Sequence, residues 1–201
     1  MKIALFDLDG TIIKTNSLIG FIKFAKGSFK TYCGFIIFLP ILIIYRLGVF
    51  PNYLAKELIF CYFFKGMSES NFAALSKAFS LSYLDENINK EAMKKILWHK
   101  ENGHEVVVVS ASIESWIEPW CEMNDLQLIA TKIESKNGFI TGKFLSKNCH
   151  GEEKCNRIKK NYNLKNYDYI YAYGDSKGDK QMLELANEGY INPEKFINWM
   201  Q

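Results

Sequence analysis

The feature that most constrains this chain is an apolar run near its start that ends in two aspartates. Residues 2–6 are rich in strand formers, and residues 7–11 read Asp-Leu-Asp-Gly-Thr. Side chains alternate faces along a strand, so the carboxylates of Asp7 and Asp9 are expected to point the same way and to repel each other. A neighbouring cation would relieve this repulsion. The pattern predicts a buried strand that ends in a charged site.

Three interpretations compete for Asp7-x-Asp9-Gly10. A calcium loop of the EF-hand type needs a bidentate glutamate at its twelfth position, and counted from Asp7 that position is Leu18, so this interpretation fails. The second interpretation is a polar turn after a strand, which the motif by itself does not exclude. The third interpretation is a magnesium-binding pair for phosphoryl transfer, because Mg²⁺ is usually held by one or two carboxylates and by substrate phosphate oxygens. It requires further phosphate and metal ligands elsewhere in the chain.

Composition is that of an ordinary globular protein. The 201 residues suffice for one substantial domain or for a core with a smaller insertion, and 48% are hydrophobic and 23% charged. With a net charge of +3 and scattered lysines, no nucleic-acid partner is expected. The five cysteines have no zinc-type spacing, which predicts buried thiols in a reducing compartment. Because a strand starts at once, without a secretory signal pattern, a cytoplasmic location is expected.

Helical spacing of apolar residues dominates between residues 15 and 83. It is clearest over residues 17–25, 51–64 and 69–79, with glycine and proline between these segments and no convincing strand. We therefore expect about four helices that form a cap over residues 15–83. The core would then consist of residues 1–14 and 84–201.

The most apolar stretch of this insertion is residues 33–45, which carry no charge and contain Pro40. Thirteen such residues fall short of the roughly twenty that span a bilayer, which favours a buried helix pair. Weak membrane association through this segment, at the inner membrane face, and a true span are the alternatives. Arg46 follows the segment. We expect its side chain to be a helix-end cation that reaches water, and the alternative is that it binds an anionic substrate.

From residue 91 onward, helix and strand alternate. The expected elements are a helix over 91–101, a buried strand over 106–109, a strand and returning strand over 126–134 and 139–144, a helix to about 162, a strand over 169–173 and a helix over 180–186. Buried apolar strands that alternate with helices predict an α/β fold with a doubly wound, Rossmann-like parallel sheet. In such a sheet the carboxyl ends of the strands gather at one crevice.

Candidate phosphate and metal ligands follow several of these predicted strands. Ser110 comes at the end of the strand over 106–109, where a hydroxyl can donate to a phosphate. Lys154 lies near the start of a helix and could reach the same phosphate, although alone it would be assigned to a solvated face. Asp175 and Asp179 follow the last strand, after Gly174.

Together these positions resemble the four signature motifs of the haloacid dehalogenase (HAD) superfamily of phosphatases. The matching residues occur in the family's order: residues 7–11, Ser110, Lys154 and the Gly174-Asp175-Ser-x-x-Asp179 stretch. The resemblance covers nearly the whole chain. It is closest to the phosphoserine-phosphatase-like branch, subfamily IB, in which a small helical cap follows the first motif.

The resemblance implies a mechanism and a cofactor. Asp7 would be the nucleophile that forms an aspartyl-phosphate, and Asp9 would be the general acid and then the general base. Mg²⁺ would be held by Asp7, the backbone carbonyl of Asp9, and Asp175. Ser110 and Lys154 would bind the phosphate oxygens. The supporting residues would be Asp179, Gly174 and Thr11.

The chain departs from phosphoserine phosphatases at the positions that read the substrate. Those enzymes carry a glutamate nine residues after the nucleophile, where this chain has Asn16, and two glycines where it has Ala111 and Ser112. We therefore expect a small-molecule phosphomonoester, or a phosphate of envelope-lipid or surface-glycan synthesis, rather than free phosphoserine. The alternatives are a phosphoserine phosphatase, a phosphotransferase, and a non-catalytic membrane-associated binding protein on the same scaffold.

Overall fold

The computed structural model describes residues 1–191, and the last ten residues of the predicted core, 192–201, lie outside the described part. Its centre is a five-stranded sheet in the order β3-β2-β1-β6-β7, and every neighbouring pair is parallel. The strands are β1 (Lys2–Phe6), β2 (Glu105–Ile113), β3 (Gln127–Thr131), β6 (Tyr169–Gly174) and β7 (Glu188–Ile191). The parallel α/β sheet predicted from the sequence is thus confirmed, with β7 as an edge strand that the sequence analysis missed.

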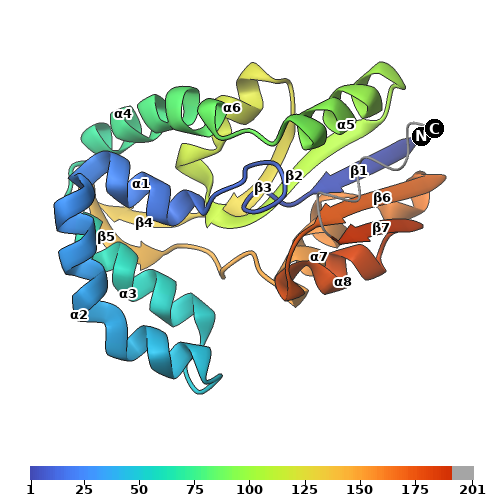
Figure 1. Ribbon diagram of the computed structural model, residues 1–201. Helices are drawn as coiled ribbons and strands as arrows, with labels where there is room; N and C mark the ends of the chain where they lie inside the picture. The colour runs from blue at the N-terminus through green and yellow to red at the C-terminus, as the bar shows by residue number, and fades with distance from the viewer. Residues whose placement is uncertain (192–201) are drawn as a thin grey trace.

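Helices cover both faces of this sheet, as a doubly wound fold requires. Figure 1 shows α5 (Lys90–Glu101) and α6 (Glu118–Met123) on one face and α7 (Glu152–Asn161) and α8 (Lys180–Glu184) on the other. Alternate residues of β1 serve the two layers: Phe6 joins the cluster of α5 and α6, while Leu5 joins the cluster of α7 and α8. The strand is therefore apolar on both sides, which explains its uninterrupted hydrophobic run.

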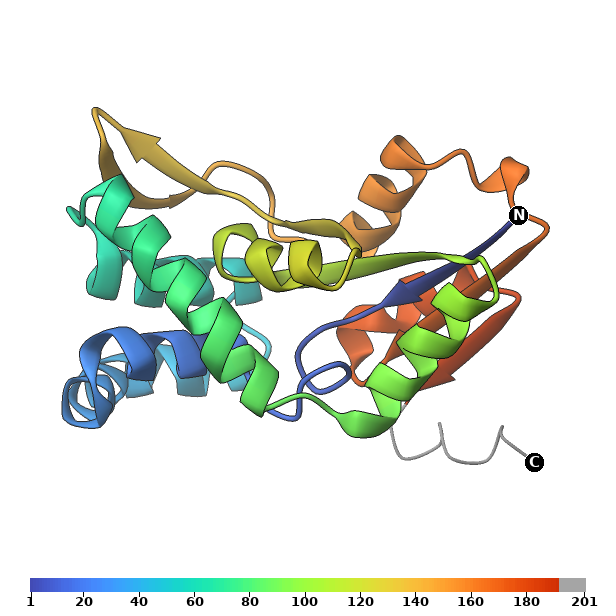
Figure 2. The same ribbon diagram turned by 90° about the horizontal axis from the view of Figure 1, so that it is seen from above.

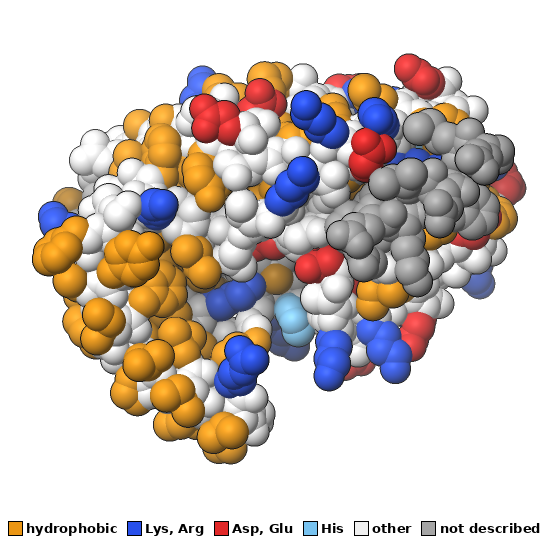
Figure 3. Space-filling model, viewed as in Figure 1, with side chains coloured by type: hydrophobic (Ala, Val, Ile, Leu, Met, Phe, Trp, Pro, Cys, Tyr) orange, Lys and Arg blue, Asp and Glu red, His pale blue; other side chains and the backbone are white. Residues whose placement is uncertain are grey.

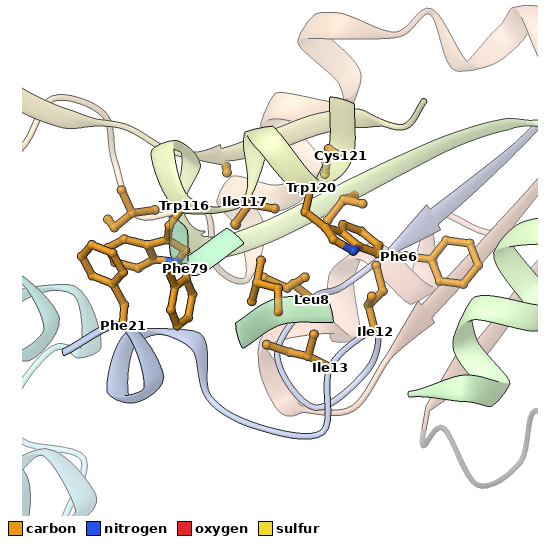
Figure 4. Packing of buried hydrophobic residues seen from close by; sticks show 14 of the residues in the cluster. Phe6, Leu8, Ile12, Ile13, Phe21, Phe79, Trp116, Ile117, Trp120 and Cys121 are labelled. Atoms are coloured by element: carbon orange, nitrogen blue, oxygen red, sulfur yellow. The ribbon is translucent and has the colours of Figure 1, made fainter. Parts of the chain in front are cut away.

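Four helices follow β1 and lie beyond the carboxyl ends of the strands (Figure 1). They are α1 (Ser17–Lys26), α2 (Ser28–Arg46), α3 (Asn52–Phe64) and α4 (Glu69–Phe79), and a π-helical turn, Ser80–Leu84, leads back to α5. Figure 4 shows how aromatic side chains join this region to the sheet. Phe21 of α1 stacks on Trp116, which follows β2, at 4.4 Å between ring centroids, and meets Phe79 of α4 edge to face at 5.2 Å. Such pairs contribute about 0.5–1.5 kcal/mol each beyond their burial.

The prediction for the apolar stretch 33–45 was wrong in two respects. It lies in one helix, α2, which continues through Pro40, and of the residues in this helix Thr31, Gly34 and Phe38 are buried. Proline inside a helix costs about 3 kcal/mol. The helix tolerates it because both halves are held by packing, with Gly34 against Phe63 of α3 and Leu42 against the main core. Most of the other residues of α2 face outward, since α1 and α3 meet the helix on one side.

The predicted strand over 126–134 is also wrong, because the chain divides there into two strands of different sheets. β3 ends at Thr131, and β4 (Ile133–Lys136) pairs with β5 (Phe139–Phe144) in an antiparallel hairpin. The turn residue Asn137 has a φ of 54°, as a tight hairpin turn requires. The hairpin lies against the helical region, where the backbone of Gly66 donates to Ile140 at 2.8 Å. Figure 2 shows it projecting from the sheet toward α4.

Two smaller expectations also need correction. β2 extends to Ile113, so Ser110 lies within a strand and not at its end. The cysteines are free thiols, but only three of the five are buried; Cys61 is half-buried and Cys33 is exposed on α2. Exposure of Cys33 follows from the outward orientation of most of α2.

Candidate active site

The loop after β1 presents the first two carboxylates. Asp7 extends the parallel ladder, since its N–H donates to the Tyr173 carbonyl at 2.9 Å, and its side chain is buried. Gly10 then turns the chain with a φ of 81°. A Cβ at Gly10 would lie 2.1 Å from Oδ2 of Asp175, so only glycine lets the loop after β1 approach the loop after β6 this closely.

Lys154 is a fully buried cation between two aspartates. Its Nζ donates to Oδ1 of Asp7 at 2.5 Å and to Oδ1 of Asp179 at 2.6 Å. Burial by itself would lower the pKa of Lys154, but the two carboxylates outweigh it and hold the pKa above its usual value. Lys154 is therefore the cation expected beside Asp7, although its second partner is Asp179 and not Asp9, and it does not lie on a solvated helix face.

The loop after β6 is ordered around Asp179. Oδ2 of Asp179 accepts hydrogen bonds from the hydroxyl and the backbone N–H of Ser176, at 2.8 and 3.1 Å. A Cβ at Gly174 would lie 2.5 Å from Cβ of Asp179, so glycine is needed behind this carboxylate. Both oxygens of Asp179 are thus engaged, one by Lys154 and one by its own loop. Asp179 acts here as a positioning residue for Lys154 and for the neighbouring Asp175.

Three carboxylates converge at this point, and their chemistry fits a divalent cation. One oxygen each from Asp7, Asp175 and Asp179 lie within 4.8 Å of one another. Lys154 balances only one of these three negative charges. Burial raises the pKa of Asp7 to about 7, with Lys154 opposing and Asp179 adding to the rise, and burial also raises the pKa of Asp175. Magnesium prefers carboxylate oxygens and would offset the remaining charge, so the donor set fits Mg²⁺.

Asp9 is held apart from this cluster by groups from two other elements. Its Oδ1 accepts the backbone N–H of Ser17, at the start of α1, at 3.0 Å. Its Oδ2 accepts the hydroxyl of Ser112, on β2, at 2.9 Å. The hydroxyls of Ser17 and Ser112 are themselves 2.5 Å apart. Ser112, expected from the sequence to read the substrate, thus fixes the orientation of Asp9.

The remaining predicted positions fall into two groups. Ser110, Ala111 and Asn16 line the same cavity as Asp7 and Asp9. The Ser110 hydroxyl oxygen accepts the N–H of Ser112 at 3.1 Å, which leaves its proton free to donate into the cavity. Asn16 also caps α1 by accepting the N–H of Ile19 at 3.1 Å.

Two further predicted residues lie away from the cavity wall. Thr11 is buried below the loop, where its carbonyl accepts from Asn89 at 3.2 Å and ties the loop to α5. Arg46 is exposed at the end of α2 and does not line the cavity. Arg46 is thus a solvent-exposed cation at a helix end, as the sequence analysis favoured.

The cavity has a volume of about 450 Å³, and its outer wall contains residues that the sequence analysis did not single out. These are Tyr45, Asn52, Lys56, His150 and Lys177. Burial lowers the pKa of Lys56, although Asp9 and Asp7 partly offset this, and burial next to Lys56 and Lys154 lowers the pKa of His150. An isolated lysine on an amphipathic helix gives no sequence signal of such a role. The cavity adjoins a second hollow of about 720 Å³, with Asn52 and His150 on the shared wall.

Comparison with known proteins gives the same assignment as the geometry. The family model of the haloacid dehalogenase-like hydrolases matches residues 4–184. A histidinol-phosphatase from Neisseria meningitidis serogroup C is 25% identical over 216 residues, which cover 96% of this chain and 91% of that protein. A Bordetella pertussis Tohama I protein of unknown function has a solved structure that superimposes with a TM-score of 0.82 at 22% identity, covering 94% of this chain and 89% of that one.

A solved phosphoserine phosphatase, described as a phospho-aspartyl intermediate analogue, superimposes with a TM-score of 0.68 at 16% identity and covers 100% of this chain and 99% of that one. At this identity the likeness concerns the fold. The family match over most of the chain, the phosphatase relative and the four converging motifs lead to one conclusion. The chain belongs to the haloacid dehalogenase-like hydrolases and is a phosphatase of that family.

Proposed function

We propose that the protein is a Mg²⁺-dependent phosphomonoester phosphatase that works through an aspartyl-phosphate on Asp7. The observation that carries this proposal is the buried Lys154, which bonds Asp7 and Asp179 at 2.5 and 2.6 Å beside a third carboxylate, Asp175. Asp7, Asp175 and the loop after β1 would hold Mg²⁺. The ion would supply positive charge that lets an anionic nucleophile approach an anionic phosphate.

In the first step an oxygen of Asp7 attacks phosphorus, and the ester P–O bond breaks as the new P–O bond forms. Asp9 in its acid form gives its proton to the departing alkoxide, which leaves as an alcohol. Ser110 and Lys154 are placed to bind the phosphate oxygens, where charge accumulates. The hydrogen bonds from Ser112 and the Ser17 backbone hold Asp9 in position for this transfer.

In the second step water attacks the phosphorus of the aspartyl-phosphate and gives a proton to Asp9. The bond between phosphorus and Asp7 then breaks, and inorganic phosphate and free Asp7 result. Atoms and charge balance over the cycle, because the proton that Asp9 gives to the alcohol returns from water. Asp9 therefore serves as acid once and as base once.

The cavity wall argues for a substrate other than free phosphoserine. Within the described lining, the acidic residues are Asp7, Asp9, Asp175 and Asp179, to each of which the proposed site gives a role. The outer wall instead carries Lys56, Lys177 and His150. A substrate ammonium group would meet the cations of Lys56 and Lys177 there, while a further anionic or polar group would be favoured. The adjoining hollow leaves room for a larger alcohol part, as in a lipid or glycan precursor.

The test is phosphate release with and without Mg²⁺ across a panel of phosphomonoesters. The panel contains phosphoserine, phosphoethanolamine, histidinol phosphate, sugar phosphates and phosphatidylglycerophosphate. The wild-type protein is expected to need Mg²⁺, and Asp7→Asn to lose turnover by at least about 10⁴-fold because the nucleophile is gone. Asp85→Asn makes the same change at an exposed site and is expected to leave turnover unchanged.

Mass spectrometry of an acid-quenched reaction is expected to show a phosphoryl group on Asp7 of the wild-type protein. Turnover by Asp7→Asn, or turnover without any divalent cation, would contradict the proposal. Transfer of the phosphoryl group to an added alcohol in preference to water would identify a phosphotransferase instead. Equal turnover of small polar and lipid-borne phosphates would contradict the substrate class.

A further inference from the structure

Helix α2 has two apolar faces, and the protein covers one of them. Its buried residues, Thr31, Gly34 and Phe38, face α1 and α3. On the opposite side Phe29, Ile36 and Ile43 follow one another at intervals of seven residues, about two helical turns, and are 80%, 69% and 52% exposed. A surface helix normally carries polar residues on its outward face. The outward face of α2 is therefore exceptional.

The apolar surface extends beyond the helix. We call it the outer apolar face. Its members are exposed large hydrophobic residues of α2, of the turn that follows it and of α3: Phe29, Tyr32, Ile36, Ile37, Leu39, Ile43, Ile44, Leu47, Val49, Leu58 and Tyr62. Figure 3 shows hydrophobic side chains gathered over this end of the molecule. A contiguous patch of this kind on a monomer marks an interaction site with a protein or a membrane.

Along residues 10–56, which contain the whole of α2, all charged side chains have the same sign. No acidic residue occurs between Asp9 and Glu57, whereas Lys14, Lys23, Lys26, Lys30, Arg46 and Lys56 all lie in that interval. Lys30 stands in the first turn of α2 and Arg46 ends it, and both are exposed. Apolar residues on one face with cations at the borders are typical of a helix that lies in the interface of an anionic membrane.

We propose that the outer apolar face docks on an anionic lipid surface, with α2 lying in the plane of the interface. The helix does not span the bilayer in this arrangement, because its buried face stays packed against α3, where Gly34 meets Phe63. A second copy of the chain fits the face less well, since the cations at the borders would then face cations. Lipid phosphates complement them, at about 1 kcal/mol for each cation near the surface.

The docked orientation would place the active-site cavity next to the lipid. The use of this placement for a lipid-borne substrate rests on the proposed phosphatase function. Tyr45, near the end of α2, belongs to the cavity wall. Its hydroxyl accepts a hydrogen bond from Asn52 of α3 at 2.8 Å, which joins the end of the outer apolar face to the mouth of the cavity. A phosphomonoester carried on a lipid could then reach Asp7 with its apolar part still in the membrane.

The experiment is flotation of the protein with vesicles of phosphatidylcholine alone and with vesicles that contain roughly one third phosphatidylglycerol, whose negative surface potential attracts cations. The wild-type protein is expected to float with the anionic vesicles. The double variant Ile36→Glu/Ile43→Glu is expected to bind them at least about tenfold less, because two charges replace exposed apolar side chains that would enter the lipid interface. The double variant Lys23→Glu/Lys30→Glu is expected to bind the anionic vesicles more weakly, because it removes two cations. Its binding should also depend less on salt concentration. Leu97→Glu, at an exposed leucine of α5, is the matched control and should bind like the wild type.

Failure of this proposal can be told apart from failure of the proposed function. The Ile36→Glu/Ile43→Glu variant is expected to retain wild-type turnover of a water-soluble phosphomonoester, since both side chains are exposed and lie outside the cavity. Absence of wild-type binding to anionic vesicles would overturn the docking proposal whatever the enzyme activity. Release from membranes only by detergent would show a span, and a dimer abolished by the double variant without vesicle binding would show a second copy. Either result would overturn the proposal.

Discussion

In most proteins charged side chains are exposed and large apolar side chains are buried. The carboxyl edge of the sheet and the outer apolar face of α2 each reverse one of these rules. At the sheet edge, charged residues are buried, and Asp7, Lys154 and Asp179 satisfy one another through bonds of 2.5 and 2.6 Å. On α2, large apolar residues such as Ile36 are exposed, and within residues 1–191 nothing covers them. A buried charge is tolerable because the same chain supplies its partner. The exposed apolar face has no such partner within the described residues. We therefore propose that a lipid surface outside the chain covers it.

The largest expected effect comes from breaking the buried ion pairs. Lys154→Met keeps most of the side-chain volume but leaves Asp7 and Asp179 without their cation, so the free energy of unfolding should fall by about 3–5 kcal/mol. Urea denaturation measures this loss. Lys94→Met is the matched control, because the Lys94–Glu91 pair is also short, at 2.9 Å, but exposed. That change is expected to cost at most about 0.5 kcal/mol. Similar losses in the two variants would refute the contrast between buried and exposed pairs.

The second effect is a pH dependence of the metal-free protein. The pKa of Asp7 rises from 3.8 to about 7 in the fold, so between these values the native state binds more protons than the unfolded state. The contribution of Asp7 to stability is therefore largest below pH 4 and is lost as the pH rises through 7, by on the order of a few kcal/mol. Urea denaturation in EDTA at several pH values measures this loss.

Two comparisons sharpen the assignment of that pH dependence to Asp7. Mg²⁺ is expected to reduce the loss at high pH, because it binds the ionised carboxylates of the native state. Asp7→Asn is expected to flatten the curve of the metal-free protein, since asparagine cannot ionise. A metal-free stability that increases between pH 5 and 8 through the action of Asp7 would contradict the assignment.

The smallest of these effects contrasts the two faces of α2. Replacing glycine by alanine in a helix usually stabilises it, yet a Cβ at Gly34 would lie 2.2 Å from Cζ of Phe63. Gly34→Ala is therefore expected to destabilise the protein by about 1–3 kcal/mol through overpacking. Ile36→Ala, two residues along on the exposed face, should change stability by at most about 0.5 kcal/mol. Thermal or urea denaturation of both variants distinguishes the faces, and a larger loss for Ile36→Ala would mean that the outward face is covered.

The residues of the candidate site could be predicted from the sequence because each motif is a short local pattern. Asp7 and Asp9 are two residues apart after a buried strand, and Asp175 and Asp179 follow another strand with Gly174 before them. Parallel strands bring their carboxyl ends to one edge, so short motifs far apart in the chain must converge there. The spacing of the motifs could not predict which side chains contact each other. Ser112 binds Asp9, and Asp179 binds Lys154, because of contacts between side chains from different elements.

The sequence by itself determined the parallel α/β sheet, the order of its signature motifs and the helical character of residues 17–79. These follow from local periodicity and from the backbone preferences of glycine, both of which are short-range. Only the tertiary structure decided that α2 is a single helix facing outward, that the hairpin after β3 leaves the sheet, and that Lys56 and His150 line the cavity. The physical reason is that an apolar or cationic residue has the same local pattern whether or not another element covers it. Its burial depends on which helices and strands pack beside it.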